Sequence, residues 1–284
     1  MSNKIVLGTN VLPKYHQSKI NRLLSLGLQI SDMVDTSPNY KSSQSTLGVF
    51  RSTVDNQFRI STKCLHHIKI LSPSQMRNQF SRSLEALCVD SVDYLFIHTT
   101  NFTDFSRAHF DTLLDFKSKG LAKNIGYSGD NLNLEKFSKT FGSALDAFMV
   151  TQNIVDQGNR RLIHEIKEKY SCQIFSKRSM ANGFWRKKNI ARKLLGISTP
   201  DRDIYKLRWR NLFCDLSLSK NEMFSEFFLY NFLDEYIDFV CIGISNINQI
   251  KKIKKILDNP KMIYSFSQYH KLWDRGSMET QALI

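Results

Sequence analysis

VDTSPNY (residues 34–40), FRISTK (58–63) and VDYLFIH (92–98) carry one repeated pattern. Each begins as a short run rich in apolar and β-branched residues, which is typical of a buried strand, and each places ionisable side chains at or just after the end of that run. The side chains are the carboxylate of Asp35, the phenol of Tyr40, the amine of Lys63 and the imidazole of His98. Parallel barrels gather catalytic residues from the carboxyl ends of several strands, so the pattern favours a barrel enzyme.

The same alternation of an apolar run and an amphipathic stretch continues along the chain. Further strands are expected in IVLG (5–8), AKNIGYS (122–128), AFMVTQN (147–153), CQIFSK (172–177) and DFVCIGIS (238–245). A helical pattern follows each of them except CQIFSK, after which a long irregular region precedes a helical stretch from Glu222 to Tyr236. Eight strand–helix units, with crossovers long enough for parallel pairing, predict one (β/α)8 TIM barrel domain over residues 1–284. A doubly wound sheet is the alternative, but no G-x-G-x-x-G follows the first strand.

Local signals place several helix boundaries. In INQIKKIKKIL (247–257), the apolar residues share one helical face and the lysines take the other. Ser72 and Pro73 stand where an N-cap and the first helical residue are expected. Gly120 stands just past the end of a helical pattern, where a glycine is favoured.

Composition excludes several classes of protein. Of the 284 residues, 42% are hydrophobic and 23% are charged, and the 20 phenylalanines supply an ample core. Five widely spaced cysteines without a CxxC pair indicate neither a disulfide framework nor a zinc site, and we expect no metal. The opening MSNKIVLGTN lacks the apolar core of a signal peptide, and no run approaches the ~18 apolar residues of a membrane helix. We therefore expect a cytoplasmic protein with no membrane partner.

The net charge of +14 is unevenly distributed. Seven Lys or Arg and no acid lie between residues 176 and 193, and four lysines lie at 251, 252, 254 and 255. Basic patches attract the phosphates of cofactors, of nucleotide-linked substrates and of nucleic acids, although a solvated face is an equally good interpretation. Nucleic-acid binding is not favoured, because no recognition motif or stacking platform accompanies the charge.

The four residues of the first pattern suggest one reaction. A tyrosine is a poor acid at neutral pH unless a neighbour stabilises its anion, and a lysine ammonium held by an aspartate would do so. A histidine at the mouth of the site would hydrogen-bond and polarise the substrate oxygen. The expected reaction is hydride transfer to a carbonyl carbon with proton delivery to its oxygen. Because side chains supply no hydride, a nicotinamide cofactor is implied.

The motifs that contain these residues resemble the aldo-keto reductase family. DTSPNY (35–40) resembles the family's DTAxxY, and KSSQSTLG (41–48) follows it where the family carries G-x-S-E-x-x-L-G. STK (61–63) matches the family's TK, and SRSLEALCVDSVDYLFIH (81–98) follows its SLxxLGxDYxDLxxxH. The likeness continues in KGLAKNIGYS (119–128), in the strand before Gln152 and in GISNINQI (243–250). It implies a barrel with the catalytic tetrad Asp35, Tyr40, Lys63 and His98, in which Tyr40 is the general acid.

The resemblance also implies cofactor contacts, and here the sequence departs from the family. Ser128 and Gln152 are expected at the nicotinamide carboxamide, but the neighbouring asparagine is Gly129. KRSMANG (177–183) replaces the family's sPLxxG loop, and Ile244-Ser245 with Gln249 replaces its Lys-Ser…Arg pattern for a 2′-phosphate. The candidate cofactor residues in these two segments are Lys177, Arg178, Met180, Ser245 and Gln249. On charge we prefer NADP(H) over NAD(H), with Lys251 or the basic run after Lys177 supplying the missing phosphate contacts.

Two hypotheses follow. The first is an NAD(P)H-dependent enzyme that reduces an aldehyde, a ketone or a keto-sugar, including phosphorylated or nucleotide-linked ones. The basic loop WRKKNIARK (185–193) on the rim would suit such a substrate, or would clasp the cofactor's pyrophosphate. The second is a cofactor-binding barrel that acts as a regulatory or partner-binding subunit without turnover, since fold alone does not prove activity.

Overall fold

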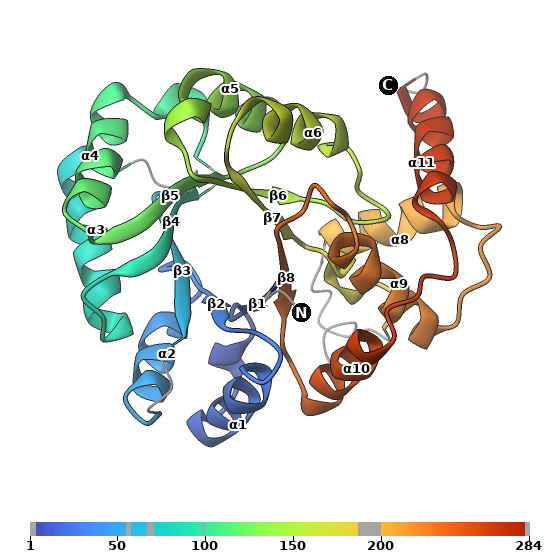
Figure 1. The fold of residues 1–284 in the computed structure, drawn as a ribbon, viewed down its shortest axis with the longest axis horizontal. Coiled ribbons are helices and arrows are strands. Elements are labelled where there is room, and N and C mark those ends of the chain that lie inside the picture. The colour runs from blue at the N-terminus through green and yellow to red at the C-terminus, as the bar shows by residue number, and fades with distance from the viewer. Residues whose placement is uncertain (1–3, 55–57, 67–70, 99, 187–199, 282–284) are drawn as a thin grey trace.

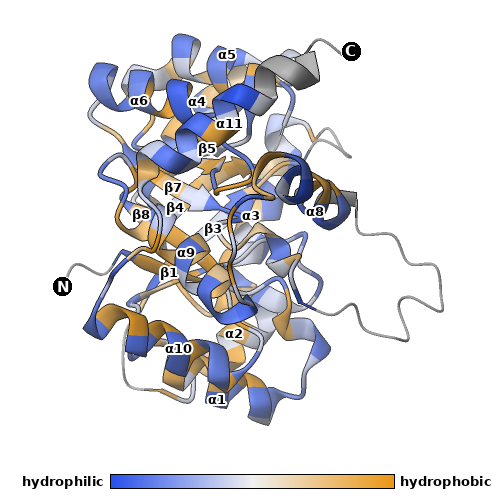
Figure 2. Ribbon diagram, turned by 90° about the vertical axis from the view of Figure 1, so that its right-hand side faces the viewer, coloured by the Kyte–Doolittle hydropathy of each residue, from blue (hydrophilic) through white to orange (hydrophobic). Residues whose placement is uncertain are grey.

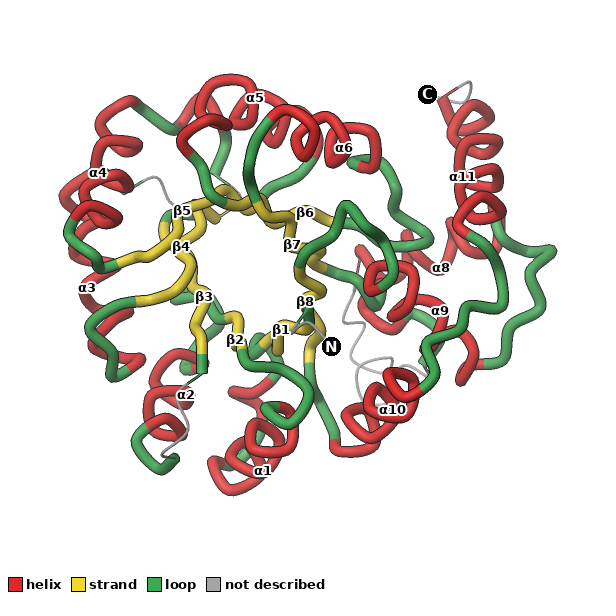
Figure 3. The backbone as a smooth tube through the Cα atoms, viewed as in Figure 1, coloured by secondary structure: helices red, strands yellow, loops and turns green. Residues whose placement is uncertain are grey.

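Eight parallel strands close into a barrel in the order in which they occur in the chain (Figure 1). The computed structural model describes residues 4–54, 58–66, 71–98, 100–186 and 200–281. Strand β1 pairs with β2 on one side and with β8 on the other, so the sheet has no edge. Helices surround the ring of strands, which encloses the centre of the molecule (Figure 3). The predicted (β/α)8 barrel is confirmed.

The strand bounds agree closely with the predicted apolar runs. The strands are β1 (Ile5–Gly8), β2 (Met33–Asp35), β3 (Arg59–Cys64), β4 (Val92–His98), β5 (Ala122–Ser128), β6 (Ala147–Thr151), β7 (Gln173–Lys177) and β8 (Phe239–Gly243). The α-helices are α1 (Gln17–Gly27), α2 (Ser43–Arg51), α3 (Pro73–Leu87), α4 (Arg107–Ser118), α5 (Asn131–Phe141), α6 (Arg160–Lys169), α8 (Pro200–Leu212), α9 (Lys220–Phe232), α10 (Ile247–Asp258) and α11 (Phe266–Gln281).

The local helix signals act as expected. Ser72 caps α3 by accepting a hydrogen bond from the backbone N–H of Gln75, whose side chain in turn accepts one from the N–H of Ser72. Gly120 has φ of +70°, a left-handed conformation that glycine adopts without strain just past the end of α4. In α10, Ile250 and Ile253 are buried while the four lysines are exposed.

Side chains fill the barrel rather than leaving a channel. Tyr94, Phe96, Phe175 and Phe239 pack edge-to-face and stacked inside the ring, with centroids 4.4–6.1 Å apart. A second apolar layer lies between the strands and the helices, whose outward faces are hydrophilic (Figure 2). Because the interior of the barrel is filled, side chains at the carboxyl ends of the strands rest on a packed layer of aromatic rings.

Aspartates join neighbouring strands at the amino end of the barrel. Asp93, Asp146 and Asp238 each accept a backbone N–H from a strand beside their own, at 2.7–2.8 Å, and each also pairs with a lysine. These bonds help to hold the strands in register, because each one joins the beginning of one strand to its neighbour. Chemistry at this end of a barrel is not expected, since barrel enzymes place their sites at the opposite end.

The long segment between β7 and β8 is more regular than predicted. It contains α8, which was expected to be irregular, and α9, which begins within three residues of the predicted helical stretch. The C-terminal α11 packs beside α8 (Figure 1) and is held by Glu226, a buried carboxylate that accepts hydrogen bonds from Tyr269 and from the backbone of Ile263 and Tyr264. In the described part of the chain, no helix combines the length and apolarity needed to cross a membrane.

Candidate active site

The carboxyl ends of the strands open into a cavity of about 790 Å³. All four residues of the predicted tetrad, Asp35, Tyr40, Lys63 and His98, line it. Asp35 ends β2, Lys63 lies near the end of β3 and His98 ends β4, so three adjacent strands deliver them side by side. The tetrad residues therefore lie together, as the sequence predicts.

Asp35 and Lys63 form a buried ion pair at the floor of the cavity. The ammonium of Lys63 donates to both carboxylate oxygens of Asp35 at 2.7 Å and to the carbonyl of Thr36 at 2.8 Å. Lys63 is 1% exposed and Asp35 is 5% exposed. The hydroxyl of Ser61 donates to the same carboxylate at 2.7 Å. Each charge is thus compensated and hydrogen-bonded, which a buried pair needs in order to be stable.

Tyr40 lies beside this pair, with the nitrogen of Lys63 5.0 Å from the centre of its ring. Burial raises the pKa of Tyr40, the positive charge of Lys63 lowers it, and the negative charge of Asp35 raises it; the net direction is upward. For Lys63, burial lowers the pKa, but Asp35 and the Tyr40 anion outweigh it and the pKa is raised. As expected from the sequence, the charge of Lys63 lowers the pKa of Tyr40. Burial raises this pKa by more, so the net shift is upward. Tyr40 keeps its proton at neutral pH and Lys63 keeps its charge.

His98 faces Tyr40 across the cavity, with ring centroids 6.2 Å apart in an edge-on arrangement. Its Nδ1 lies 3.4 Å from the hydroxyl of Ser37 and 3.4 Å from the amide nitrogen of Asn39, and the ring of His66 lies 5.0 Å away. The imidazole therefore lies in the wall of the cavity, between these polar neighbours and Tyr40. A small oxygen-bearing group between Tyr40 and His98 would meet two hydrogen-bonding side chains.

Most of the predicted cofactor residues lie around the same cavity. Ser128, Lys177, Arg178, Met180, Ser245 and Gln249 line it. Gln152 is 1% exposed and is not among the lining residues, but its Oε1 is buried and has no hydrogen-bond donor among the described residues. A buried acceptor without a donor is unusual, and the amide N–H of a nicotinamide carboxamide is the type of donor that it lacks. Among the described residues, this oxygen is therefore an acceptor that a bound amide could satisfy.

Lys177 is less available for phosphates than its sequence suggests. Its ammonium pairs with Asp130 at 3.0 Å, and its side chain is 16% exposed. Burial lowers the pKa of Lys177, which Asp130 partly offsets. Asp130 is itself fixed because it accepts the backbone N–H of Thr151 at 2.6 Å, and Thr151 is the register partner of Lys177. Lys177 therefore contributes to the wall of the cavity as a neutralised pair.

Gly129 stands where the family carries an asparagine, and the structure gives a physical reason. A Cβ at this position would collide with the ring of Tyr127. Tyr127 cannot move aside freely, because its ring stacks on Phe137 with centroids 3.8 Å apart and its hydroxyl donates to the carbonyl of Thr100. An aromatic side chain thus occupies the space of the missing amide contact.

Ser245 and Gln249 shape the loop that follows β8. The amide oxygen of Gln249 accepts the N–H and the hydroxyl of Ser245, and its amide nitrogen donates to the carbonyl of Gly243 at 2.8 Å. Gln249 also lines a smaller cavity of about 190 Å³, which shares Arg186 and Gln249 with the main one. Its other walls include Trp185, Phe224, Lys220 and Lys252. Lys251, which the sequence analysis offers for a phosphate contact together with the basic run after Lys177, does not line this cavity, whereas Lys220 and Lys252 do.

Some residues of the cavity were missed from the sequence. Asn39 and His66 contribute polar groups, and Cys241 also lines the cavity, where burial raises the pKa of its thiol far above the ordinary value. Arg186, from the basic run that the sequence places at the rim, lines the cavity as well. Cys241 lies in the middle of β8, and no signal in the sequence marks it as a residue of the cavity. Most of the basic loop WRKKNIARK falls in residues 187–199, outside the described part of the chain.

Comparisons with known proteins agree with this geometry. Residues 4–274 match the sequence model of the aldo/keto reductase family. A Pseudomonas aeruginosa protein assigned to the aldo-keto reductases is 18% identical, with a TM-score of 0.67 over 91% of each chain. The aldo-keto reductase AKR11C1 of Bacillus halodurans, in its holo form, is 17% identical, with a TM-score of 0.74 over 95% of this chain and 91% of that one. At these identities the two structures demonstrate a shared fold. None of the curated proteins matches the chain in sequence.

Proposed function

The chain belongs to the aldo/keto reductase family, and on that premise we propose that it reduces the carbonyl of an aldehyde or ketone to an alcohol with a nicotinamide cofactor. The observation that carries the proposal is the buried Asp35–Lys63 pair beside Tyr40 at the floor of an open cavity. This arrangement places a protonated phenol next to a fixed cation, where a substrate oxygen that gains negative charge would be stabilised. A purely structural barrel would have no need of such a pair at its open end.

Each residue of the tetrad has a separate role in this proposal. When bound, the nicotinamide supplies a hydride to the carbonyl carbon. Tyr40 donates its hydroxyl proton to the carbonyl oxygen, and Lys63 stabilises the phenolate that remains. Asp35 keeps Lys63 charged and directs it through two hydrogen bonds of 2.7 Å. His98, opposite Tyr40, hydrogen-bonds the same oxygen and orients the carbonyl.

Protein groups for the cofactor lie on the other side of the cavity. We propose that Ser128 and the unpaired oxygen of Gln152 bind the carboxamide of the nicotinamide. The smaller cavity beside Gln249 would receive the adenosine end, with Trp185 and Phe224 against the base. Lys220, Lys252 and Arg186 surround this cavity with positive charge, and in the described part of the chain no acidic residue lines it. A 2′-phosphate would therefore be favoured, which supports NADPH over NADH.

Deuterium transfer tests the reaction type directly. The protein is incubated with 4-nitrobenzaldehyde and NADPH deuterated at the transferable position of the nicotinamide. We expect 4-nitrobenzyl alcohol that carries one deuterium on the former carbonyl carbon. Failure to reduce this compound and a wide panel of other carbonyls, despite tight NADPH binding, would contradict the reductase proposal and would favour a regulatory subunit.

A further inference from the structure

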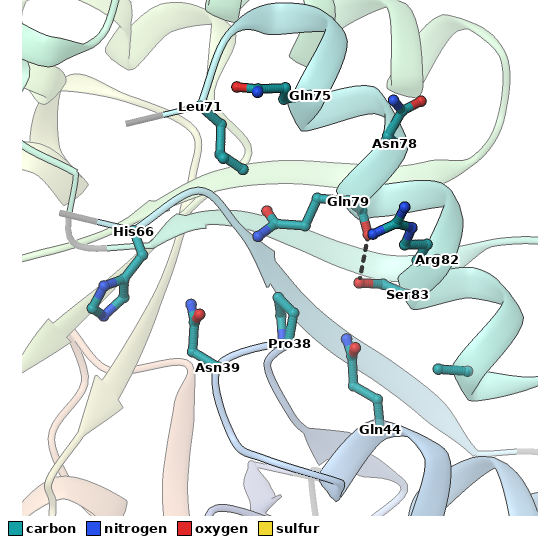
Figure 4. Close-up of a pocket in the computed structure, with 11 residues that line it drawn as sticks. Pro38, Asn39, Gln44, His66, Leu71, Gln75, Asn78, Gln79, Arg82 and Ser83 are labelled. Carbon is teal, nitrogen blue, oxygen red and sulfur yellow. Dashed lines mark hydrogen bonds between the residues drawn. The ribbon is translucent and has the colours of Figure 1, made fainter. Parts of the chain in front are cut away.

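A second cavity, of about 590 Å³, lies beside the catalytic one, between the loop after β2 and the helix α3 (Figure 4). The two cavities share Asn39 and His66, so they join next to His98. Neither the tetrad nor the proposed cofactor site uses it. Its volume is within the range of sites that bind small molecules.

One face of α3 lines this cavity with polar side chains at helical spacing. Gln75, Asn78, Gln79 and Arg82 occur at i, i+3, i+4 and i+7, whereas Met76, Phe80 and Leu87 lie on the buried face of the same helix. Ser83 is buried and also lines the cavity. The polar stripe is about 10 Å long, from seven residues at the helical rise. The side chain of Gln79 points from α3 toward Pro38 and Asn39 on the opposite wall (Figure 4).

The groups that line this cavity include several hydrogen-bond donors and one cation, beside the amide oxygens of Asn78 and Gln44. The amide oxygen of Gln79 accepts the N–H of Leu65 at 2.8 Å, and that of Gln75 accepts the N–H of Ser72 at 2.9 Å. The amide nitrogens of these two glutamines have no acceptor among the described residues. Arg82 adds a guanidinium, and among the described residues none that lines the cavity is acidic. A surface with donors, one cation and no carboxylate is complementary to an oxyanion.

We propose that this cavity, the oxyanion groove, binds a carboxylate or phosphate at the far end of the carbonyl substrate, with Arg82 as its charged contact. The aldehyde or ketone then lies between Tyr40 and His98, and the chain of the substrate passes Asn39 and His66 to reach α3. The proposal rests on the proposed reductase function and names its substrate class, an anionic carbonyl compound. Specificity would come from α3, outside the centre of the barrel.

Kinetics with matched sugars tests the groove. Glucose, glucose 6-phosphate and glucuronate present the same aldehyde with a neutral, phosphorylated or carboxylated sixth carbon. We expect KM to be at least about tenfold lower for one or both anionic sugars than for glucose. The variant Arg82→Met should reduce this preference to about twofold or less, and Asn78→Asp, which brings a negative charge into the groove, should do the same. Both residues are exposed, and we expect both variants to fold.

The matched control is Arg22→Met, which removes an exposed arginine from α1 and should leave the preference unchanged. The relative KM of the two anions identifies which of them the groove prefers. If the wild-type protein shows no preference for the anionic sugars, or if the preference is kept in Arg82→Met, the proposal that the oxyanion groove binds the anionic group through Arg82 is wrong.

The failure of the groove is distinguishable from the failure of the reductase proposal. If 4-nitrobenzaldehyde is reduced but no preference for anionic sugars is seen, the reductase proposal is supported and anion binding in the oxyanion groove is contradicted. If no carbonyl is reduced, calorimetric titration with glucose 6-phosphate still tests the groove. Binding that is lost in Arg82→Met, but kept in Arg22→Met and Lys252→Met, supports it. Binding that is lost in Lys252→Met instead places the phosphate in the cofactor cavity and contradicts it.

Discussion

Replacing Lys63 by methionine removes the cation at the centre of the site while keeping a side chain of similar length. The ammonium makes three hydrogen bonds, two to Asp35 at 2.7 Å and one to the carbonyl of Thr36 at 2.8 Å. In Lys63→Met the carboxylate of Asp35, which is 5% exposed, retains the hydroxyl of Ser61 but no positive partner. Loss of one partner from a buried ion pair costs about 3–5 kcal/mol of folding free energy.

The second half of this prediction concerns the double variant. Asp35→Asn combined with Lys63→Met removes the uncompensated charge, so most of the loss should be recovered and about 1–2 kcal/mol should remain for the broken hydrogen bonds. The free energy of unfolding is measured by urea titration with circular dichroism at neutral pH. Reduction of 4-nitrobenzaldehyde is measured on the same preparations without urea. It should be lost from both variants, because neither keeps a cation beside Tyr40.

The control is Lys123→Met, which breaks a pair with Asp93 of similar length, 2.9 Å, in which the lysine is 65% exposed and Asp93, 16% exposed, keeps the backbone N–H of Ile60. That change should cost no more than about 1 kcal/mol. If Lys63→Met is no more destabilising than Lys123→Met, or if the double variant is less stable than Lys63→Met, the reasoning about the buried pair is wrong.

Three further predictions concern other parts of the site. Because the pKa of Tyr40 is raised above its ordinary value near 10 and the protonated form is the acid, kcat for reduction should stay level from about pH 6 to 9 and fall only above about pH 10; a fall centred near pH 7 would assign the proton to another group. Gly129→Ala should destabilise the protein by about 1–3 kcal/mol through collision with Tyr127, and the loss in urea titration should shrink in the Tyr127→Ala background; simple additivity of the two changes would exclude that collision. Lys252→Met should weaken NADPH about tenfold in a fluorescence titration and leave NADH nearly unchanged; equal weakening would place the 2′-phosphate elsewhere.

The barrel and the tetrad are predictable from the sequence because both depend on local patterns. The apolar run of β4 (Val92–His98) ends on a residue of the proposed tetrad, and the same holds for Asp35 at the end of β2. Once the strands are parallel and adjacent, their carboxyl ends meet at one end of the barrel. No long-range information is then needed to bring Asp35, Lys63 and His98 together. The capping signals of α3 and Gly120 are equally local.

The parts that were missed depend on contacts between distant segments. Lys177 reads as a free cation in a basic run, but it meets Asp130, which is far from it in the sequence and is held by the backbone of Thr151. Helix α11 (Phe266–Gln281) depends on the buried Glu226, whose partners lie in the segment before it and in the helix itself. In the sequence, the polar residues of α3 look like an ordinary solvent-exposed helix face. Their place in a cavity is seen only when the opposite wall, Pro38 and Asn39, is known.

Tyr40→Phe removes a single oxygen from the site, and its comparison with the wild-type protein tests whether Tyr40 is the general acid. NADPH binding is followed by fluorescence, and turnover of 4-nitrobenzaldehyde is measured on the same preparations. If Tyr40 donates the proton, the variant should bind NADPH with unchanged affinity and lose at least about 100-fold in kcat. Undiminished turnover in Tyr40→Phe would contradict the account, because the reaction would then take its proton from another source.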